Sequence, residues 1–174
     1  MTIIQSKSPG VPDTARQNKV GMADILIIFH SQTGNTEKMA RAVARGVDDV
    51  ANARAVLKRA ADAVAQDLRD CSALVICSPE YFGYMANALK DFFDRTYEEL
   101  KDDATVYRKP FCIVVSAGND GSFALSHIER ICKGYRFKMV QKPIVCKGRA
   151  TEEVLGKCFE LGSTIAEGVN ARVF

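Results

Sequence analysis

The chain of 174 residues has the length and composition of one globular domain, since 47% of its residues are apolar and 26% are charged. No apolar run approaches the roughly 20 residues that a membrane-spanning helix requires, and the N-terminus lacks the apolar core of a secretory signal, so a cytoplasmic location is expected. The net charge of +3 comes from 24 basic and 21 acidic residues mixed along the chain. A nucleic-acid partner is not expected, because such proteins usually carry a basic stripe or cluster.

None of the six cysteines is paired as C-x-x-C, which argues against a zinc ribbon or a dithiol redox motif, and no metal site is expected. Cys77, Cys112 and Cys146 lie within or at the ends of apolar runs, where a thiol packs like a small hydrophobic side chain. We therefore predict reduced core thiols, as is usual in the cytoplasm. A catalytic cysteine is the alternative.

Residues 1–22 are polar, are interrupted by prolines and glycines and show no periodicity, which predicts a flexible N-terminal tail. One domain is expected to follow over residues 23–174. In it, short apolar runs typical of strands buried on both faces alternate with helical patterns. The strands are expected at residues 25–29, 53–57, 73–77, 111–115 and 143–146.

A helix is expected after each strand, and in all but the short second one apolar residues recur along one helix face. The first two helices are expected at residues 37–50 and 62–69, and the last begins at Thr151 as its N-cap. The third carries Met85, Leu89, Phe92, Phe93 and Leu100, and the fourth Leu125, Ile128, Cys132 and Tyr135. Five β-α units in a row predict an α/β fold with a parallel sheet covered by helices on both faces. In such sheets ligands bind beyond the carboxyl ends of the strands.

The loop after the first expected strand, residues 31–36, is rich in hydroxyls and contains Gly34. Free backbone N–H groups at a helix N-terminus form a ready anion site, and a glycine lets the backbone approach a ligand closely. No lysine follows Gly34 as a Walker A loop requires, and the G-x-G-x-x-G dinucleotide pattern is absent. The loop therefore predicts a cradle for one terminal phosphate. A helix cap rich in serine and threonine is the alternative.

The loops after the third and fourth expected strands complete the candidate site. Residues 78–85 place three aromatic side chains around Gly83, which suits a flat heteroaromatic ligand that needs faces to stack on and donors for its edge. The alternative is that these aromatic rings simply cover the next helix. Residues 116–122 carry two glycines among short polar residues, which fits close backbone approach to a ligand edge, although alone this is only a turn.

Together these loops resemble the flavodoxin superfamily. The S-x-T-G-N-T pattern at residues 31–36 resembles the FMN-phosphate loop of flavodoxins, and residues 78–83, running into 88–95, resemble the NAD(P)H-dependent flavin and quinone reductases of that superfamily. The resemblance covers residues 23–174. It implies a flavodoxin-like three-layer sandwich with a five-stranded parallel sheet of order 2-1-3-4-5, and FMN as the cofactor.

The resemblance also implies which residues contact FMN. The phosphate is expected to be bound by the side chains of Ser31, Thr33, Asn35 and Thr36 with the backbone amides of Gln32 and Gly34. The isoalloxazine ring is expected to be flanked by Pro79, Glu80, Tyr81, Phe82 and Gly83. Its pyrimidine or ribityl side is expected to be lined by Ser116, Gly118, Asn119 and Gly121.

Two departures from the electron-carrier flavodoxins favour an enzyme. Those carriers commonly stack the flavin between a tryptophan after the second strand and a tyrosine after the third, whereas this chain has no tryptophan and no aromatic residue in the segment 58–62. They are also typically strongly acidic, whereas this chain has a net charge of +3. One flavin face is therefore expected to stay open to substrates.

The leading hypothesis is an NAD(P)H-dependent reductase in which the nicotinamide passes hydride to flavin N5 and a quinone or related planar acceptor then takes the two electrons. The cofactor carries the chemistry, so no catalytic residue is certain. Tyr81 and His127 are candidates for contacting the acceptor, with packing or a surface position as the alternative for each. Two other functions stay open: a one-electron flavodoxin carrier, and a flavin-free interaction or regulatory domain. Many reductases of this superfamily are homodimers or homotetramers, so the resemblance leaves both assemblies open for this chain.

Overall fold

The computed structural model describes residues 21–174, so the predicted tail lies outside the described residues except for Gly21 and Met22. Strands and helices alternate along the chain. In order they are β1 (Ala23–Phe29), α1 (Asn35–Asp48), β2 (Ala53–Arg59), α2 (Ala65–Asp70), β3 (Ala73–Tyr81), β4 (Tyr84–Met85), α3 (Asn87–Leu100), β5 (Pro110–Ala117), α4 (Ser122–Gly134), β6 (Lys138–Met139), β7 (Ile144–Lys147) and α5 (Glu152–Asn170).

The sheet confirms the predicted fold class and differs from the prediction in two details. Strands run in the order β2-β1-β3-β5-β6, with all pairs along this path parallel. The expected fourth and fifth strands are β5 and β7, which pair directly. Because β5 is longer than β7, its first residues also pair with the short β6, which the sequence did not predict. The other unpredicted strand, β4, pairs antiparallel with the end of β3.

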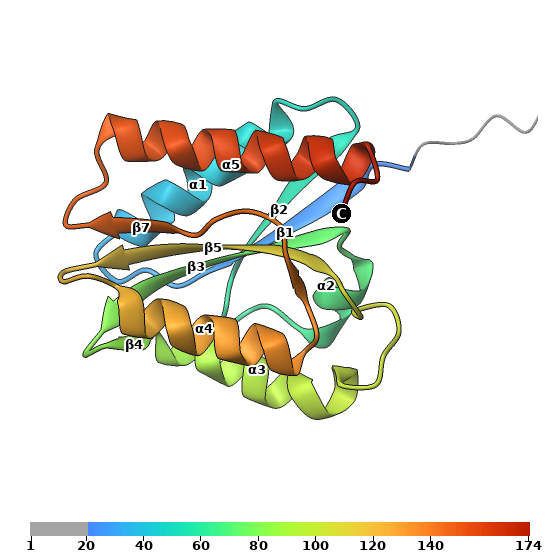
Figure 1. Cartoon of the computed structure of the whole chain (residues 1–174), viewed down its shortest axis with the longest axis horizontal. Coiled ribbons are helices and arrows are strands. Elements are labelled where there is room, and N and C mark those ends of the chain that lie inside the picture. Colours follow the sequence, from blue (N-terminus) through green and yellow to red (C-terminus); the bar gives the residue numbers. More distant parts are fainter. Residues whose placement is uncertain (1–20) are drawn as a thin grey trace, which may run out of the picture.

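Helices cover both faces of the sheet, with α1 and α5 on one side and α3 and α4 on the other (Figure 1). The strands supply both cores, because successive side chains point to opposite faces. In β1, Ile25 and Ile27 face α1 and α5, while Leu26 and Ile28 face the helices of the other layer. Strands buried in this way on both sides explain the continuous apolar runs in the sequence.

The helix α5 packs along α1 at unusually short range because both helices carry a glycine at the contact. A Cβ atom placed on Gly46 of α1 would lie 1.9 Å from the carbonyl oxygen of Phe159. One placed on Gly162 of α5 would lie 2.1 Å from the carbonyl oxygen of Val43. The Ser163 hydroxyl donates to the Gly46 carbonyl across the same contact at 3.0 Å. The two backbones therefore touch, with no room for a side chain between them.

Three element boundaries bear on the sequence-based expectation. Met85 lies in β4 and not in the third helix, which begins only at Asn87. The helix α2 begins at Ala65, three residues later than predicted, after a turn in which the Arg59 carbonyl accepts two backbone hydrogen bonds. The last helix begins as predicted, because the Thr151 hydroxyl accepts a hydrogen bond from the backbone N–H of Val154 at 3.3 Å.

The short helix α2 ends against a buried ammonium group. Lys109, immediately before β5, is only 6% exposed. Its Nζ donates to the carbonyl oxygens of Leu68 and Arg69 in α2, and to that of Cys71 at 2.6 Å. A cation at this position satisfies carbonyls that have no partner within the helix and meets the negative end of its dipole.

Asp103, between α3 and β5, gives the fold a predictable response to acid. Its carboxylate accepts the backbone N–H and hydroxyl of Thr105 at 2.9 and 2.6 Å and Nε of Arg69 at 2.8 Å. These bonds, those of Thr105 first, lower the pKa of Asp103 to about 2 from its usual value of 3.8. A folded-state pKa below the unfolded one means that this stabilisation is present above about pH 4 and is lost as the pH falls towards about 2.

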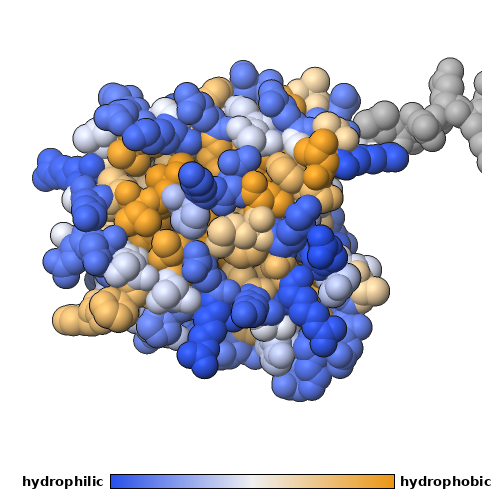
Figure 2. All heavy atoms as spheres, viewed as in Figure 1, coloured by the Kyte–Doolittle hydropathy of each residue, from blue (hydrophilic) through white to orange (hydrophobic). Residues whose placement is uncertain are grey.

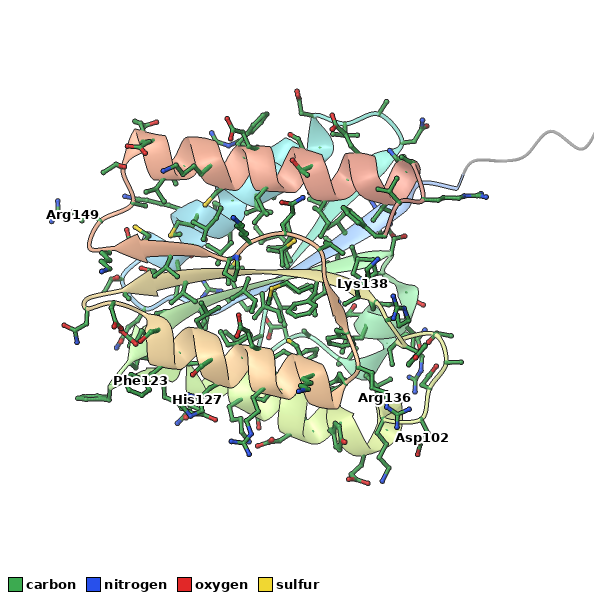
Figure 3. The ribbon with its side chains drawn as sticks, viewed as in Figure 1. Asp102, Phe123, His127, Arg136, Lys138 and Arg149 are labelled. Atoms are coloured by element: carbon green, nitrogen blue, oxygen red, sulfur yellow. The ribbon has the colours of Figure 1, made fainter. Side chains whose placement is uncertain are left out.

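We therefore expect the D103N variant to be less stable than the wild type at pH 6, with the difference shrinking between pH 4 and pH 2. Urea unfolding at closely spaced pH values measures this. The neighbouring Asp102, labelled in Figure 3, is exposed and has no side-chain hydrogen bond or ion pair within residues 21–174, so D102N is the matched control. A D103N curve parallel to that of the wild type across this range would contradict the assignment.

All six cysteines are free and buried, as the core-thiol prediction requires. Burial raises the pKa of Cys71 to about 11 and that of Cys112 to about 12, so these thiols stay protonated near neutral pH. Within residues 21–174 no cluster of histidine, cysteine or acidic side chains is arranged to hold a metal ion. None of the helices in this part of the chain is long and apolar enough to span a membrane.

Candidate functional site

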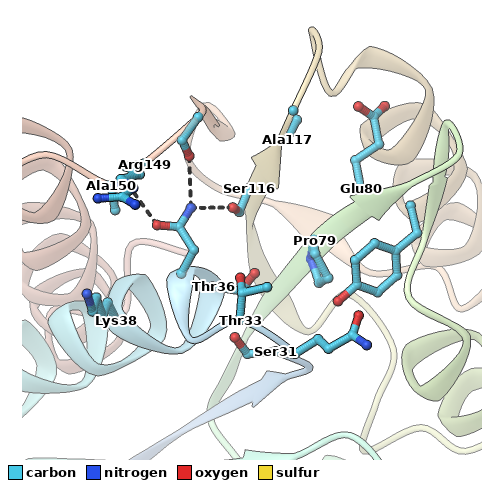
Figure 4. A pocket seen from close by; sticks show the side chains of 15 residues that line it. Ser31, Thr33, Thr36, Lys38, Pro79, Glu80, Ser116, Ala117, Arg149 and Ala150 are labelled. Carbon is cyan, nitrogen blue, oxygen red and sulfur yellow. Dashed lines mark hydrogen bonds between the residues drawn. The ribbon is translucent and has the colours of Figure 1, made fainter.

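The carboxyl ends of β1, β3, β5 and β7 open onto one cleft of about 580 Å³, within the usual range for a small-molecule site. Figure 4 shows this cleft from close by. Its lining consists of Ser31, Gln32, Thr33, Asn35, Thr36, Lys38, Pro79, Glu80, Tyr81, Ser116, Ala117, Gly118, Gly148, Arg149 and Ala150. The three loops singled out in the sequence therefore meet, and the connection from β7 to α5 joins them.

The first loop turns sharply into α1 and leaves backbone donors free. Gly34 is the N-cap at φ 88°, a left-handed conformation that favours glycine, and its N–H donates to the Ser31 hydroxyl at 3.1 Å. The first helical bond runs from Lys38 N–H to the Gly34 carbonyl at 3.0 Å. The N–H groups of residues 35–37 thus have no acceptor within the helix. Together with the buried Thr36, they form a positively polarised rim suited to an anion.

The Asn35 side chain ties three loops together. Its Nδ2 donates to the Ser116 hydroxyl at 2.6 Å and to the Gly148 carbonyl at 2.9 Å, and its Oδ1 accepts the Ala150 N–H at 2.9 Å (Figure 4). Both amide hydrogens are therefore used within the protein. The backbone N–H of Asn35 is therefore the one hydrogen-bond donor of this residue that remains for a ligand in the cleft. The resemblance had instead implied that the Asn35 side chain contacts the FMN phosphate.

The second segment is the end of a strand rather than a loop. Ser78 to Tyr81 continue β3, and Ser78 is buried, with its hydroxyl accepting the Ala86 N–H at 3.1 Å. Pro79, Glu80 and Tyr81 line the cleft. Tyr81 is the one aromatic residue among the cleft-lining residues of the described chain, and its ring meets that of His30 edge-on at 6.1 Å.

Phe82 and Gly83, expected to flank the ring, instead form the turn between β3 and β4. Their φ angles are 50° and 77°, the pair of positive values that a two-residue hairpin requires. Phe82 is fully exposed and lines a second hollow on the outer side of Tyr81, with Tyr84 and His30. Neither turn residue lines the cleft.

The third loop divides in the same way. Ser116 and Gly118 line the cleft, whereas Asn119 and Gly121 do not. Gly121 has a structural reason to be glycine, because it caps α4 at φ 72° and a Cβ there would lie 2.7 Å from Cγ1 of Val145. Asp120 accepts the N–H and hydroxyl of Ser122, and these bonds lower the pKa of its carboxyl.

His127 lies away from the cleft. It is on α4 (Figure 3), where Nδ1 is 2.7 Å from the Phe123 carbonyl oxygen and the ring is 4.4 Å from that of Tyr84. These contacts are those of a packed helix residue. Of the two candidates for contacting an acceptor, Tyr81 lines the cleft and His127 does not.

Several cleft residues were not singled out in the sequence: Lys38, Ala117, Gly148, Arg149 and Ala150. Lys38 lies one turn into α1, and the others end a strand or follow one. A signal was available for residues 148–150, because they follow the last parallel strand and the carboxyl ends of parallel strands meet at one edge of a sheet. The apolar run before residues 148–150 is short, however, and predicts a strand only weakly.

Comparison with solved structures places the fold among flavodoxin-like proteins. A flavodoxin from the domain Archaea matches with a TM-score of 0.72 at 23% identity, covering 84% of this chain and 98% of that one. A WrbA-like flavodoxin from Agrobacterium tumefaciens matches with a TM-score of 0.72 at 18% identity, covering 86% and 98%. Rubredoxin oxygen:oxidoreductase from Desulfovibrio gigas matches at 0.74 and 19%, covering 86% of this chain and 37% of that much longer one.

The family follows from the sequence match. Residues 47–152 match the family model of the NADPH-dependent FMN reductases, and this is more than half of the chain. The protein belongs to that family. It is a flavin-binding oxidoreductase of flavodoxin-like fold, as the sequence resemblance predicted.

Proposed function

We propose that the protein uses FMN, bound in the cleft, to transfer two electrons from NAD(P)H to a quinone or a related planar acceptor. The observation that carries this proposal is that Tyr81 is the one aromatic side chain lining the cleft. A single ring covers one face of a flat ligand and leaves the other face accessible. A nicotinamide and an acceptor need such an open face, because each must stack on the cofactor in turn.

The residues present fit FMN. The free N–H groups at the start of α1 and the hydroxyls of Ser31 and Thr36 suit a phosphate. Pro79 and Tyr81, at the end of β3, offer an apolar wall to a heteroaromatic ring, and Gly118 allows its edge to approach the backbone. Polar donors thus gather at one side of the cleft, and Pro79 and Tyr81 offer apolar surface beside Glu80 at the other, which suits the two ends of a flavin mononucleotide.

When bound, FMN supplies the two-electron chemistry between the reduced nicotinamide and the acceptor. The residues of the chain would bind FMN and orient it. The N–H groups at the start of α1 would hold the phosphate, and Asn35 keeps the three surrounding loops at fixed spacing. Tyr81 would cover one face of the ring and leave the opposite face open to the nicotinamide and the acceptor. No side chain of the cleft is assigned an obligatory acid or base role.

Nicotinamide oxidation tests this function. Protein reconstituted with FMN and mixed with NADPH or NADH and a panel of quinones is expected to oxidise the nicotinamide well above the rate of the same concentration of free FMN. For each quinone reduced to hydroquinone, one nicotinamide is consumed and one further proton is taken from solvent. Rates equal to the free-flavin background with every quinone would overturn the reductase proposal.

A one-electron carrier is the second candidate, because this chain spans 98% of the archaeal flavodoxin with which it shares its fold. A carrier binds FMN equally well and shows no turnover with nicotinamide and quinone above background. The same assay therefore separates the two functions. A protein that causes no change in flavin fluorescence and shows no rise in melting temperature on adding FMN would contradict both, since tight binding to the folded state must stabilise it.

We further propose a homodimer or homotetramer and a cytoplasmic location. Figure 2 shows hydrophobic side chains gathered between α5 and α4, over the edge that β6 and β7 form. Val140, Ile144 and Val145 of this edge are only partly buried, and Met139 is 37% exposed, as is common where subunits meet. Light scattering coupled to size exclusion measures the assembly. The six free, buried thiols support a reducing compartment.

A further inference from the structure

The connection from β7 to α5 brings a cation to the phosphate side of the cleft. Arg149 stands in this connection, extends beyond the carboxyl edge of the sheet (Figure 3) and lines the cleft. Lys38 of α1 lines it as well. In Figure 4 both lie on one side of the cleft, with Pro79 and Glu80 on the other. Among the ion pairs of residues 21–174, neither cation has a partner, so both charges are available to a ligand.

Asn35 fixes where Arg149 stands. The residues on either side of Arg149 are both held by this one amide, since the Gly148 carbonyl accepts from it and the Ala150 N–H donates to it, each at 2.9 Å. Gly148 N–H also donates to the Ala117 carbonyl at 2.8 Å. A loop anchored on both sides of one residue has few conformations left. The backbone of Arg149 is therefore held beside the start of α1 before any ligand arrives.

From this arrangement we infer that Arg149 is the residue that selects phosphorylated flavin, by neutralising the second negative charge of the FMN phosphate. This inference rests on the proposed FMN site and adds to it. The neutral hydroxyls and amides of residues 31–36 bind a phosphate through directed bonds but supply no full charge. A guanidinium matches phosphate oxygens in pairs. Asn35 is the positioning residue, because it acts through the loop that carries Arg149.

The test compares FMN with riboflavin, which lacks only the phosphate. Dissociation constants are measured by quenching of flavin fluorescence on titration with the apoprotein. R149Q is expected to bind FMN roughly tenfold more weakly, the loss expected for one charge-assisted contact, while its affinity for riboflavin stays that of the wild type. The matched control is R130Q, because Arg130 is an exposed arginine of α4 that does not line the cleft, and it should change neither affinity.

The pH dependence provides a second readout. A phosphate monoester takes up its second proton with a pKa of about 6, so wild-type affinity for FMN should fall between pH 7.5 and pH 5. Without the Arg149 charge this fall should be shallower. Riboflavin affinity should be flat in both proteins. Equal slopes for wild type and R149Q would overturn the inference.

A double-mutant cycle tests the positioning role of Asn35. In an N35A background the loop of Arg149 loses its two bonds to the Asn35 side chain and keeps only the Gly148–Ala117 bond, so the further R149Q change should weaken FMN binding much less than the tenfold expected in the wild-type background. If the effects of N35A and R149Q on FMN affinity were additive, Asn35 would not position Arg149. The outcomes separate the two proposals: wild-type protein that binds neither flavin refutes the proposed function, whereas R149Q protein that binds FMN like the wild type refutes only the role of Arg149.

Discussion

The G162A variant is expected to lose about 2–3 kcal/mol of unfolding free energy, the upper part of the range for overpacking a core. Its new methyl group would lie 2.1 Å from the Val43 carbonyl oxygen and 3.0 Å from the Val47 backbone nitrogen. These are backbone atoms of α1, which cannot move aside as a side-chain tip can. The helices must separate, and the buried apolar surface between them is then packed less closely. Denaturant unfolding followed by circular dichroism measures the change.

The same helix provides the control. Gly156 also lies within α5, but a Cβ added there has no atom within 4 Å. Because alanine favours a helix over glycine, G156A should be about 0.5–1 kcal/mol more stable than the wild type. The same substitution in one helix should thus change the unfolding free energy in opposite directions, and the difference reports the effect of the close contact. If G162A were as stable as G156A, the backbone contact between α1 and α5 would be refuted.

The K109M variant is the second large effect, with an expected loss of about 2–4 kcal/mol from two or more carbonyl groups left without a donor. Methionine keeps most of the length and apolar stem of Lys109 but removes the ammonium. The carbonyl oxygens of Leu68 and Cys71 would then be buried without their partner. Burial lowers the pKa of Lys109, and these oxygens offset that penalty by solvating the charge.

Urea unfolding and amide exchange in α2 both report on this change. Loss of the ammonium should accelerate exchange in α2 more than in α1, since only α2 ends on this group. K142M is the control, because Lys142 is exposed and has no hydrogen bond or ion pair in the described part of the chain, and its effect should stay within about 0.5 kcal/mol. A K109M protein as stable as K142M would show that the carbonyl groups find water instead.

The core of the fold was predictable because periodicity reports burial directly. Strands such as β1 and β3 are buried on both faces, so their apolar runs are unbroken, and the helix that follows β1 shows a clear apolar face. The short strands β4 and β6 were not predictable in this way. Each has two residues and exists only because a longer strand offers a free edge at that point. Such pairing depends on the assembled sheet and leaves no local pattern.

The cleft shows a similar division. Ser31 and Tyr81 stand at the ends of strong strands, and the sequence pointed to both. Phe82 was misplaced because two positive φ values turn the chain after Tyr81, and an aromatic residue is an unusual choice for such a position. The sequence did not point to Arg149, because its backbone is positioned at the cleft by Asn35, which is more than a hundred residues earlier in the chain. Contacts of that kind appear only once the fold is known.

The glycine contact between α1 and α5 also bears on the kinetics of flavin capture. The proposed phosphate site is the first turn of α1, and the loop of Arg149 leads directly into α5. Because the backbones of α1 and α5 are in contact, the first turns of the two helices stay at a fixed distance from each other. Little of the site then remains to be ordered when a ligand binds. In mobile sites, the entropy lost on ordering loops and side chains is a main reason why affinity is weaker. The association rate of FMN should therefore depend on diffusional encounter and ionic strength, and no slow rearrangement of the protein should follow the encounter.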